Sequence, residues 1–196
     1  MKKSLIVLIS ILALLVIIIG YGISINNKMV NADEAVMSQW AKVDNQYQRR
    51  ADLIPNLVNT VKGYASHEKE TLDAVVNARA KATQVTISPD NLNEASLQKY
   101  QAAQGELSQA LGRLLMVTEN YPDLKANQNF LELQAQLEGT ENRISTERTR
   151  YTDMVRDYNA MIRRFPASII AGIGGFDKKP QFTAEAGAEK APEVKF

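Results

Sequence analysis

One short motif in the sequence has residue types that could bind a catalytic metal ion. His67 and Glu68 resemble the first half of a zinc-protease helix, in which two histidines on one face bind the metal and the glutamate acts as the general base. Thr71 stands where the second histidine is required, and the chain has one histidine and no cysteine. Zinc sites depend mainly on these two residue types. We therefore predict no metal site, no cofactor, no catalytic residues and no enzymatic activity.

A second candidate is the charged group that precedes Pro55. Arg49, Arg50 and Asp52 could form a docking surface for an anionic partner. The alternative is structural: Arg50 or Asp52 pairs with charges on a facing helix, and Asp52 also caps a new helix that begins near Leu53. Both interpretations stay open, and the three charged residues are the candidate partner surface.

Glu141 and Arg148 are charged residues in a series of positions that is otherwise largely apolar. They lie one heptad apart on the inward face of a predicted helix. Buried charges are costly unless they are paired, so we expect each to have a partner, with Arg50, Glu68 and Arg79 as candidates. Polar layers of this kind can fix the register of packed helices. We predict a polar core layer at Glu141 and Arg148; the functional alternative is a proton or ion site.

These residues belong to a chain whose first segment is a candidate membrane anchor. Residues 5–25 are almost entirely apolar, and no charge lies between Lys3 and Lys28. About 20 apolar residues in a helix cross a bilayer core of about 30 Å. A cleaved signal peptide, the alternative, usually has an apolar region of about 7–15 residues. The longer run predicts a retained transmembrane anchor within residues 1–27, with the lipid bilayer as a partner.

Basic residues near the ends of this span predict its orientation. Lys2 and Lys3 precede it, whereas Lys28 is followed by Asp33 and Glu34. Because basic residues are retained on the cytoplasmic side, we expect a single-pass protein of the cytoplasmic (inner) membrane with an extracytoplasmic or periplasmic domain. Lys2 and Lys3 are two of 23 basic residues, which leaves 21 basic against 22 acidic residues. This balance offers no field to attract nucleic acid.

The rest of the chain predicts an all-α fold. Apolar residues in steps of three and four indicate a first long helix over residues 28–83, which Pro55 either bends or breaks in two. Ser88 and Pro89 form a typical helix start, followed by a second helix to about residue 119. The third helix has an a/d pattern over five heptads and ends at Pro166. Its inward series is Phe130, Leu137, Ile144, Tyr151, Tyr158 and Phe165.

The predicted architecture is a transmembrane helix followed by an elongated antiparallel bundle, with coiled-coil packing, over residues 28–166. The bundle has three long helices, or four if the first is broken at Pro55. At 1.5 Å per residue the first helix is about 84 Å long. The three-helix layout places the end of the third helix far from the membrane, where an overhang would suit self-association. Residues 167–176 are expected to pack at that tip or against a partner, and residues 177–196 to be disordered.

Several motifs in the bundle resemble those of the LemA family of bacterial membrane proteins. They are R-R-A-D-L-I-P-N-L-V at residues 49–58, V-K-G-Y-A at 61–65, Y-P-D-L-K-A at 121–126 and L-E-G-T-E-N-R-I at 137–144. The resemblance covers nearly the whole chain after the span. It implies a bacterial origin, one N-terminal span and an elongated helical bundle. It implies no reaction, and no catalytic residue can be carried over from it.

The sequence therefore favours a membrane-anchored helical scaffold or adaptor of the cell envelope with no catalysis of its own. Such a protein would act through contacts with an unknown membrane or envelope protein, or through self-association as a homo-oligomer. The alternative is an accessory subunit of a membrane enzyme such as a protease. A stoichiometric enzyme partner would distinguish the accessory subunit from the scaffold.

Overall fold

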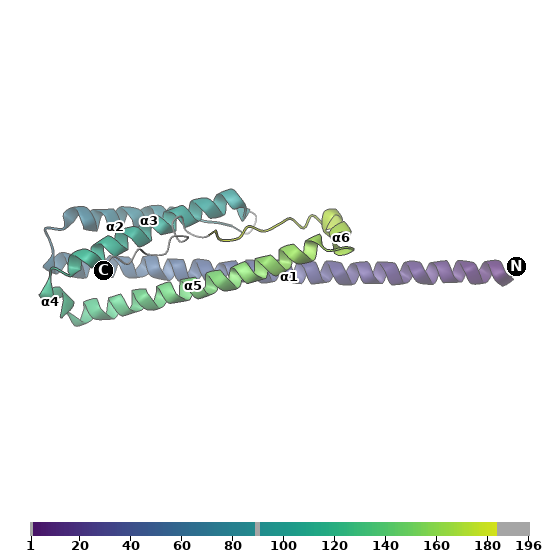
Figure 1. Ribbon diagram of the computed structural model, residues 1–196, viewed down its shortest axis with the longest axis horizontal. Helices are drawn as coiled ribbons and strands as arrows, with labels where there is room; N and C mark the ends of the chain where they lie inside the picture. The colour runs from purple at the N-terminus through teal and green to yellow at the C-terminus, as the bar shows by residue number, and fades with distance from the viewer. Residues whose placement is uncertain (1, 89–90, 184–196) are drawn as a thin grey trace, which may run out of the picture.

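The computed structural model describes residues 2–88 and 91–183, and the regular elements within these ranges are helices (Figure 1). They are α1 (Lys2–Tyr64), α2 (Lys69–Gln84), α3 (Glu94–Thr118), α4 (Pro122–Lys125), α5 (Gln128–Arg163) and α6 (Ala167–Gly174). The predictions of an all-α fold and of a long apolar N-terminal helix followed by a bundle are confirmed.

α1 is a single helix of 63 residues that joins the apolar segment to the first helix of the bundle. Among the described residues, it is the helix that is long and apolar enough to cross a membrane. Its large apolar side chains are exposed along most of residues 5–23, whereas Met29 is fully buried. The same ladder of backbone hydrogen bonds therefore continues from the apolar segment into the packed bundle.

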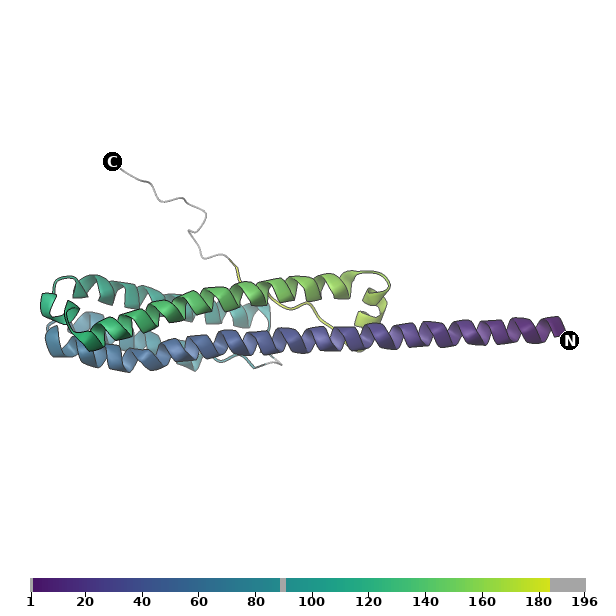
Figure 2. The same ribbon diagram turned by 90° about the horizontal axis from the view of Figure 1, so that it is seen from below.

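Three further long helices lie beside the second half of α1, and α5 and α2 pack directly against it (Figures 1 and 2). α2 returns along α1, α3 packs on α2 and runs outward again, and α4 forms part of the turn that follows. α5 then runs back beside α1, which is its main packing partner, toward the apolar segment. We call the end of the bundle at α4 the far end and the end at α6 the near end.

The predicted helix over residues 28–83 is two helices in the structure. α1 ends at Tyr64 and α2 begins at Lys69, so the chain reverses between them. Gly63 and Ser66 favour an end here, because glycine is a poor helix former and serine hydrogen-bonds to nearby backbone groups in non-helical conformations. The apolar pattern did not indicate this reversal. Leu72 follows Tyr64 by eight residues, a spacing that keeps both residues near the same face of a continuous helix.

The reversal also changes the predicted layout. With a fourth long helix in the bundle, the helix that ends near Pro166 runs toward the apolar segment instead of away from it. Ile170 of α6 consequently lies beside Gly22 of α1. The predictions of a far position for residues 167–176, and of an overhang at the far end, were wrong because the supposed first rod is an up-and-down pair.

Pro55 lies within α1 without ending it. Proline has no N–H, so the carbonyl of Ala51 loses the donor that a helix would normally supply. Arg79 of α2 replaces that donor, because its Nε donates to the Ala51 carbonyl at 2.8 Å. Ala51 is buried, so a carbonyl without a partner would be costly there. Of the bend and the break predicted at Pro55, the break does not occur, because α1 continues to Tyr64.

α3 begins later than the Ser88–Pro89 pair predicts. The side chain of Asn93 accepts a hydrogen bond from the Ser96 N–H at 3.0 Å, and the Ser96 hydroxyl accepts one from the Asn93 N–H at 3.0 Å. This reciprocal capping box satisfies two donors at the start of the helix. It places the first residue of α3 at Glu94, and Pro89 lies outside the described residues.

Two clusters of buried side chains form the core of the bundle. The far cluster is mainly aliphatic and draws on α1, α2, α3, α4 and α5, whereas the near cluster includes Trp40, Tyr100 and Tyr151. The edges of the Tyr100 and Tyr151 rings meet Trp40 at centroid distances of 5.3 and 5.6 Å. The predicted inward series of α5 is buried at Phe130, Leu137, Ile144, Tyr151 and Tyr158, but Phe165 is 83% exposed.

Residues 175–183 form a C-terminal strap that lies along the near half of the bundle. The Asn159 side chain donates to the Lys179 carbonyl and accepts from the Lys179 N–H, both at 2.9 Å. The Lys179 ammonium pairs with Asp33 of α1 at 2.8 Å. These contacts join the strap to α5 and to α1.

Phe182 anchors the end of the strap in the aromatic core. Its ring stacks on Trp40 with centroids 6.0 Å apart and meets Tyr151 edge to face at 5.4 Å. The prediction of a disordered tail is therefore wrong for residues 177–183, because an aromatic side chain and paired backbone groups hold this segment. Residues 184–196, which belong to the same prediction, lie outside the described residues.

Removal of Arg79 tests how α1 passes Pro55. We expect Arg79→Met to lower the free energy of unfolding by about 1–3 kcal/mol, because the Ala51 carbonyl is left buried without a donor. In a Pro55→Ala background the restored N–H of residue 55 bonds to Ala51 itself, so the same change should cost clearly less. A double-mutant cycle measured by urea denaturation gives this coupling. Equal costs in the two backgrounds would contradict the account.

Candidate functional site: the Arg50 cluster and its groove

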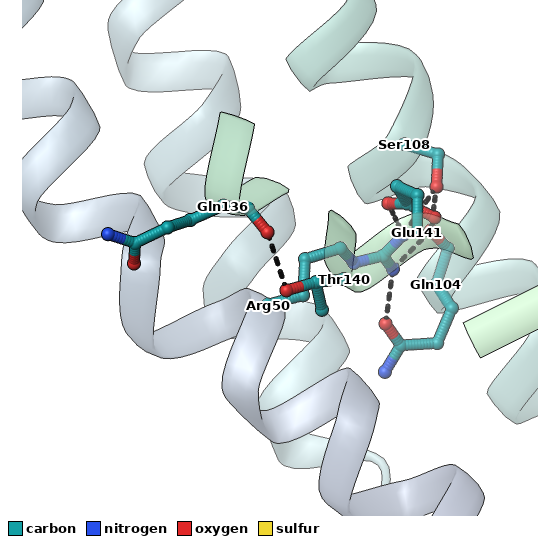
Figure 3. Close-up of polar contacts among 6 residues, drawn as sticks. All are labelled: Arg50, Gln104, Ser108, Gln136, Thr140 and Glu141. Carbon is teal, nitrogen blue, oxygen red and sulfur yellow. Dashed lines mark hydrogen bonds and ion pairs between the residues drawn. The ribbon is translucent and has the colours of Figure 1, made fainter. Parts of the chain in front are cut away.

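Arg50 is a charged side chain buried in the middle of the bundle, with 1% of its surface exposed. It extends from α1 to side chains on two other helices (Figure 3). One terminal nitrogen donates to the Ser108 hydroxyl at 2.8 Å and to a Glu141 carboxylate oxygen at 2.6 Å. The other donates to the backbone and side-chain oxygens of Gln104 at 3.2 and 2.7 Å. We call these four residues the Arg50 cluster.

The Arg50 cluster joins all four long helices of the bundle. Arg50 belongs to α1, Gln104 and Ser108 belong to α3, and Glu141 belongs to α5. Gln104 also reaches α2, because its side-chain nitrogen donates to the Ala82 carbonyl at 3.4 Å. Sliding one of these helices by a residue would break at least one of the bonds, so the cluster specifies their register.

The positive charge of Arg50 is compensated on two sides. A buried guanidinium is unfavourable unless an opposite charge and hydrogen bonds replace its water. The Glu141 carboxylate supplies the charge, although its own side chain is 45% exposed. The ring of Tyr47 lies 5.1 Å from the guanidinium carbon and adds a cation–π contact. Because solvent reaches Glu141 and screens the pair, we expect a smaller contribution than from a fully buried ion pair.

Glu141 lies in a groove of about 730 Å³ that is lined by α3 on one side and α5 on the other. Tyr47 and Arg50 of α1 also line it, and Thr183 of the strap contributes to it. Arg148 lines the groove on α5, with its guanidinium 4.6 Å from the ring of Phe182. The contribution of α3 is rich in amides: Gln98, Gln101, Gln104 and Gln109. The groove is therefore polar and carries charges of both signs.

The structure separates the three residues of the predicted partner surface. Arg49 and Asp52 are exposed on α1, whereas Arg50 is buried in the bundle, because consecutive helical residues point about 100° apart. Arg50 cannot form part of a docking surface, so the prediction is wrong for this residue. Asp52 lies inside α1 and not at a helix start. For Arg50 the structural interpretation is correct, because its guanidinium pairs with Glu141 on the facing helix α5.

The two residues of the predicted polar layer contact different parts of the protein. Glu141 bonds to Arg50, which was among the expected partners, whereas Arg148 lies two helical turns along α5 and contacts Phe182 of the strap. The other two candidates, Glu68 and Arg79, bond to different residues. Glu141 thus links α5 to Arg50 of α1, and Arg148 contacts the strap, while both side chains line the same groove.

Gln104 and Ser108 are members of the cluster that the sequence analysis missed. Gln104 lies seven residues after Leu97 and seven before Leu111, both of which are buried. This heptad spacing places Gln104 on the inward face of α3, and Ser108 follows one turn later. An inward amide that interrupts an apolar series was therefore the signal that could have indicated a polar partner for Arg50.

Two buried tyrosines of the near cluster, Tyr47 and Tyr100, lie beside the Arg50 cluster. The rings of Tyr47 and Tyr100 meet edge to face at 5.4 Å, and the Tyr100 hydroxyl donates to Asp44 at 2.8 Å. Burial, and then the Asp44 carboxylate, raise the pKa of Tyr100 well above its usual value. Burial also raises the pKa of Tyr47, against the opposing effect of Arg148 and Arg50. Both hydroxyls stay neutral near pH 7 and act in packing and hydrogen bonding.

The chemistry of the site is that of hydrogen bonding and ion pairing. The Ser108 hydroxyl donates to the Gln104 carbonyl at 3.2 Å while it accepts from Arg50. His67 lies away from it, in the reversal between α1 and α2. In the described ranges, no group of three or more histidine, cysteine, aspartate or glutamate residues is placed to hold a metal ion. The arrangement can hold four helices in register and present a polar groove.

A comparison with models of protein families identifies the family of this chain. The model of the LemA family matches residues 39–196, which include most of the bundle part of α1 and all later helices. This chain belongs to the LemA family. The resemblance that the sequence motifs indicated is thereby confirmed.

The chain is similar to magnetosome proteins and to another protein of the LemA family. Magnetosome protein MamQ 2 of Paramagnetospirillum magneticum is 24% identical over 185 residues, which cover 86% of this LemA family chain and 68% of that relative. Magnetosome protein MamQ of Magnetospirillum gryphiswaldense is 23% identical with the same coverage. Protein LemA of Metamycoplasma hominis is 21% identical over 145 residues, which cover 74% of this chain and 63% of the relative.

Neutralising Glu141 tests the role of the cluster. We expect Glu141→Gln to lower the free energy of unfolding by about 1–2 kcal/mol, because Arg50 loses its counter-charge in the core but keeps its other hydrogen bonds. The matched control is Glu138→Gln, which alters an exposed carboxylate on the same helix and should change stability by about 0.5 kcal/mol or less. Urea denaturation of the full chain in micelles measures both. Equal effects of the two changes would contradict a specific role for Glu141.

Proposed function

We propose that this LemA family protein is a membrane-anchored helical scaffold or adaptor that acts through protein contacts and has no catalysis of its own. The observation that carries the proposal is the continuity of α1, which is at once the apolar segment and the first helix of the bundle. A helix without a hinge holds the bundle at a set distance from its anchor. Such an arrangement suits the presentation of a surface better than the enclosure of a substrate.

The far end of the bundle is the surface that we propose for a partner. From Lys28 to the end of α1 at Tyr64 the helix rises about 54 Å. Three large apolar side chains near this end are exposed: Tyr64 by 44%, Met116 by 66% and Leu131 by 46%. They come from α1, α3 and α5, whose ends meet there. Exposed large apolar side chains at one end of a bundle are candidates for a contact site.

The location that we propose is the cytoplasmic membrane of a bacterium, with the bundle on the outer side. Family membership and the apolar part of α1 support membrane association. The orientation rests on the charge asymmetry of the sequence, because Lys2 and Lys3 precede the span. The partner would then be an envelope protein, a membrane protein with an outer domain, or a second copy of this chain.

Photocrosslinking in intact cells tests the proposal. A photoreactive residue at Met116 should give a discrete crosslinked product, because this side chain is exposed at the proposed contact. The same residue at Ser145, which is exposed midway along α5, is the control and should give much less. Mass spectrometry then identifies the product.

The identity of the product decides between the forms of the proposal. A product that contains one dominant protein from the outer side of the membrane supports an adaptor. A product that consists of two copies of this chain supports a self-associating scaffold. A membrane enzyme in fixed proportion would favour an accessory subunit instead. A cytoplasmic partner would contradict the proposed orientation, and no product above that of Ser145 would contradict the far-end contact.

A further inference from the structure

The corner between α5 and α6 exposes large apolar side chains at the near end of the bundle. Phe165 is 83% exposed, Ile169 is 56% exposed and Ile173 is 83% exposed. The other side of α6 is packed, with Ala171 buried and Ile170 against α1. α6 therefore has one face on the bundle and one apolar face that no described residue covers.

The position of α6 along α1 places this face at a definite level. The Ile170 side chain reaches within 3.9 Å of the point where a Cβ on Gly22 would lie. Gly22 precedes Ile25, the last residue of the apolar run, by three residues, which is about 4.5 Å along the helix. The run over residues 5–25 is about 30 Å long and matches a bilayer core. If α1 crosses a bilayer, α6 lies at the boundary between acyl chains and headgroups.

We propose that α6 and the α5–α6 corner form a second membrane contact, in which Phe165, Ile169 and Ile173 lie among the lipids of the bilayer that α1 crosses. The occupant of this face is lipid because the face is continuous with the lipid-facing surface of α1. The proposal rests on the membrane anchorage in the proposed function, but not on the scaffold role or on the far-end partner.

Charged residues around the corner fit the same level. Arg163 and Arg164 precede α6, Asp177 and Lys178 follow it, and Lys28 lies on α1 just beyond the apolar run; all five are exposed, and four of them are basic. Basic side chains next to an apolar interfacial helix meet the phosphates of headgroups while the apolar face enters the acyl region. Basic residues therefore lie on both sides of the apolar helix α6 in the sequence, as is typical of a helix at a membrane interface.

A hollow in the corner offers lipid a place to enter. It has a volume of about 390 Å³ and lies between α1 and the end of α5. Its apolar lining includes Ile25 and Met161, and its charged lining consists of Lys28, Arg164 and Asp157. The apolar walls suit the upper part of an acyl chain, and the two cations, which outnumber the single carboxylate, suit its phosphate.

A second contact has a mechanical consequence for the protein. A single helix crossing a bilayer is free to tilt and to rotate about its axis, within the limits set by its anchoring residues. An additional apolar helix on one side of it resists both motions, because either would lift α6 out of the interface or push its polar neighbours into it. The bundle would thus project at a set angle as well as at a set distance.

Fluorescent labelling of the full chain in lipid vesicles tests this proposal. The sequence has no cysteine, so a single Ile173→Cys change gives one site for an environment-sensitive NBD label, and its 83% exposure makes misfolding of little concern. The vesicles contain phosphatidylcholine and phosphatidylglycerol, either without spin label, with lipid that is spin-labelled near the headgroup end of its acyl chain, or with lipid that is spin-labelled deep in its acyl chain. Leu15→Cys, within the span, and Met116→Cys, at the far end, are the references.

We expect the label at residue 173 to have blue-shifted emission and to be quenched strongly by the shallow spin label, in contrast to the label at Met116→Cys. Emission and quenching equal to those at residue 116 would overturn the proposal. Blue-shifted emission without lipid quenching would also overturn it, because protein and not lipid would then cover α6. If Leu15→Cys were not quenched by lipid spin-labelled deep in the acyl chain, the membrane anchorage itself would fail.

Discussion

The continuity of α1 is the constraint on which the rest of the structure depends. One helix carries the apolar segment, provides the surface along which α5 packs, and reaches the far end of the bundle. Proline inside a helix normally removes a hydrogen bond and kinks the axis, yet α1 continues through Pro55 because Arg79 donates to the orphaned carbonyl of Ala51. The contact between α2 and α1 therefore helps to hold the helix that joins the anchor to the bundle.

The sequence predicted the elements of the fold better than their connection. The apolar run and the heptads of α5 follow from periodicity alone, and both are present in the structure. The reversal after Tyr64 was missed because Leu72 continues the helical steps across it, and this single miss changed the direction of α5 relative to the anchor. The packing of the strap was missed because one aromatic residue, Phe182, holds an otherwise polar segment, and its contacts with Trp40 are distant in sequence.

The candidate site shows the same limit of sequence patterns. Glu141 was identifiable because a charge in a heptad seam needs a partner, but both Arg50 and Arg79 could have supplied the opposite charge. For Arg50 the sequence left two interpretations open, a docking surface shared with Arg49 and pairing with a facing helix, because the face of the helix on which each residue lies was not known. The structure resolves this through Gln104, which is inward on α3 and bonds to Arg50 at 2.7 Å. The buried cluster then accounts for register, and the exposed ends of the bundle are left for partners and lipid.

The most direct test of the central claim is a distance along α1 in the intact protein. Spin labels at Asn27 and Asn59, both exposed, would be separated by 32 residues of helix, or about 48 Å. Double electron–electron resonance on the full chain in lipid nanodiscs should give one narrow distribution near that distance, because a single helix joins the anchor to the far part of the bundle. A broad distribution, or a maximum at a clearly shorter distance, would show a hinge between the two and would contradict the account.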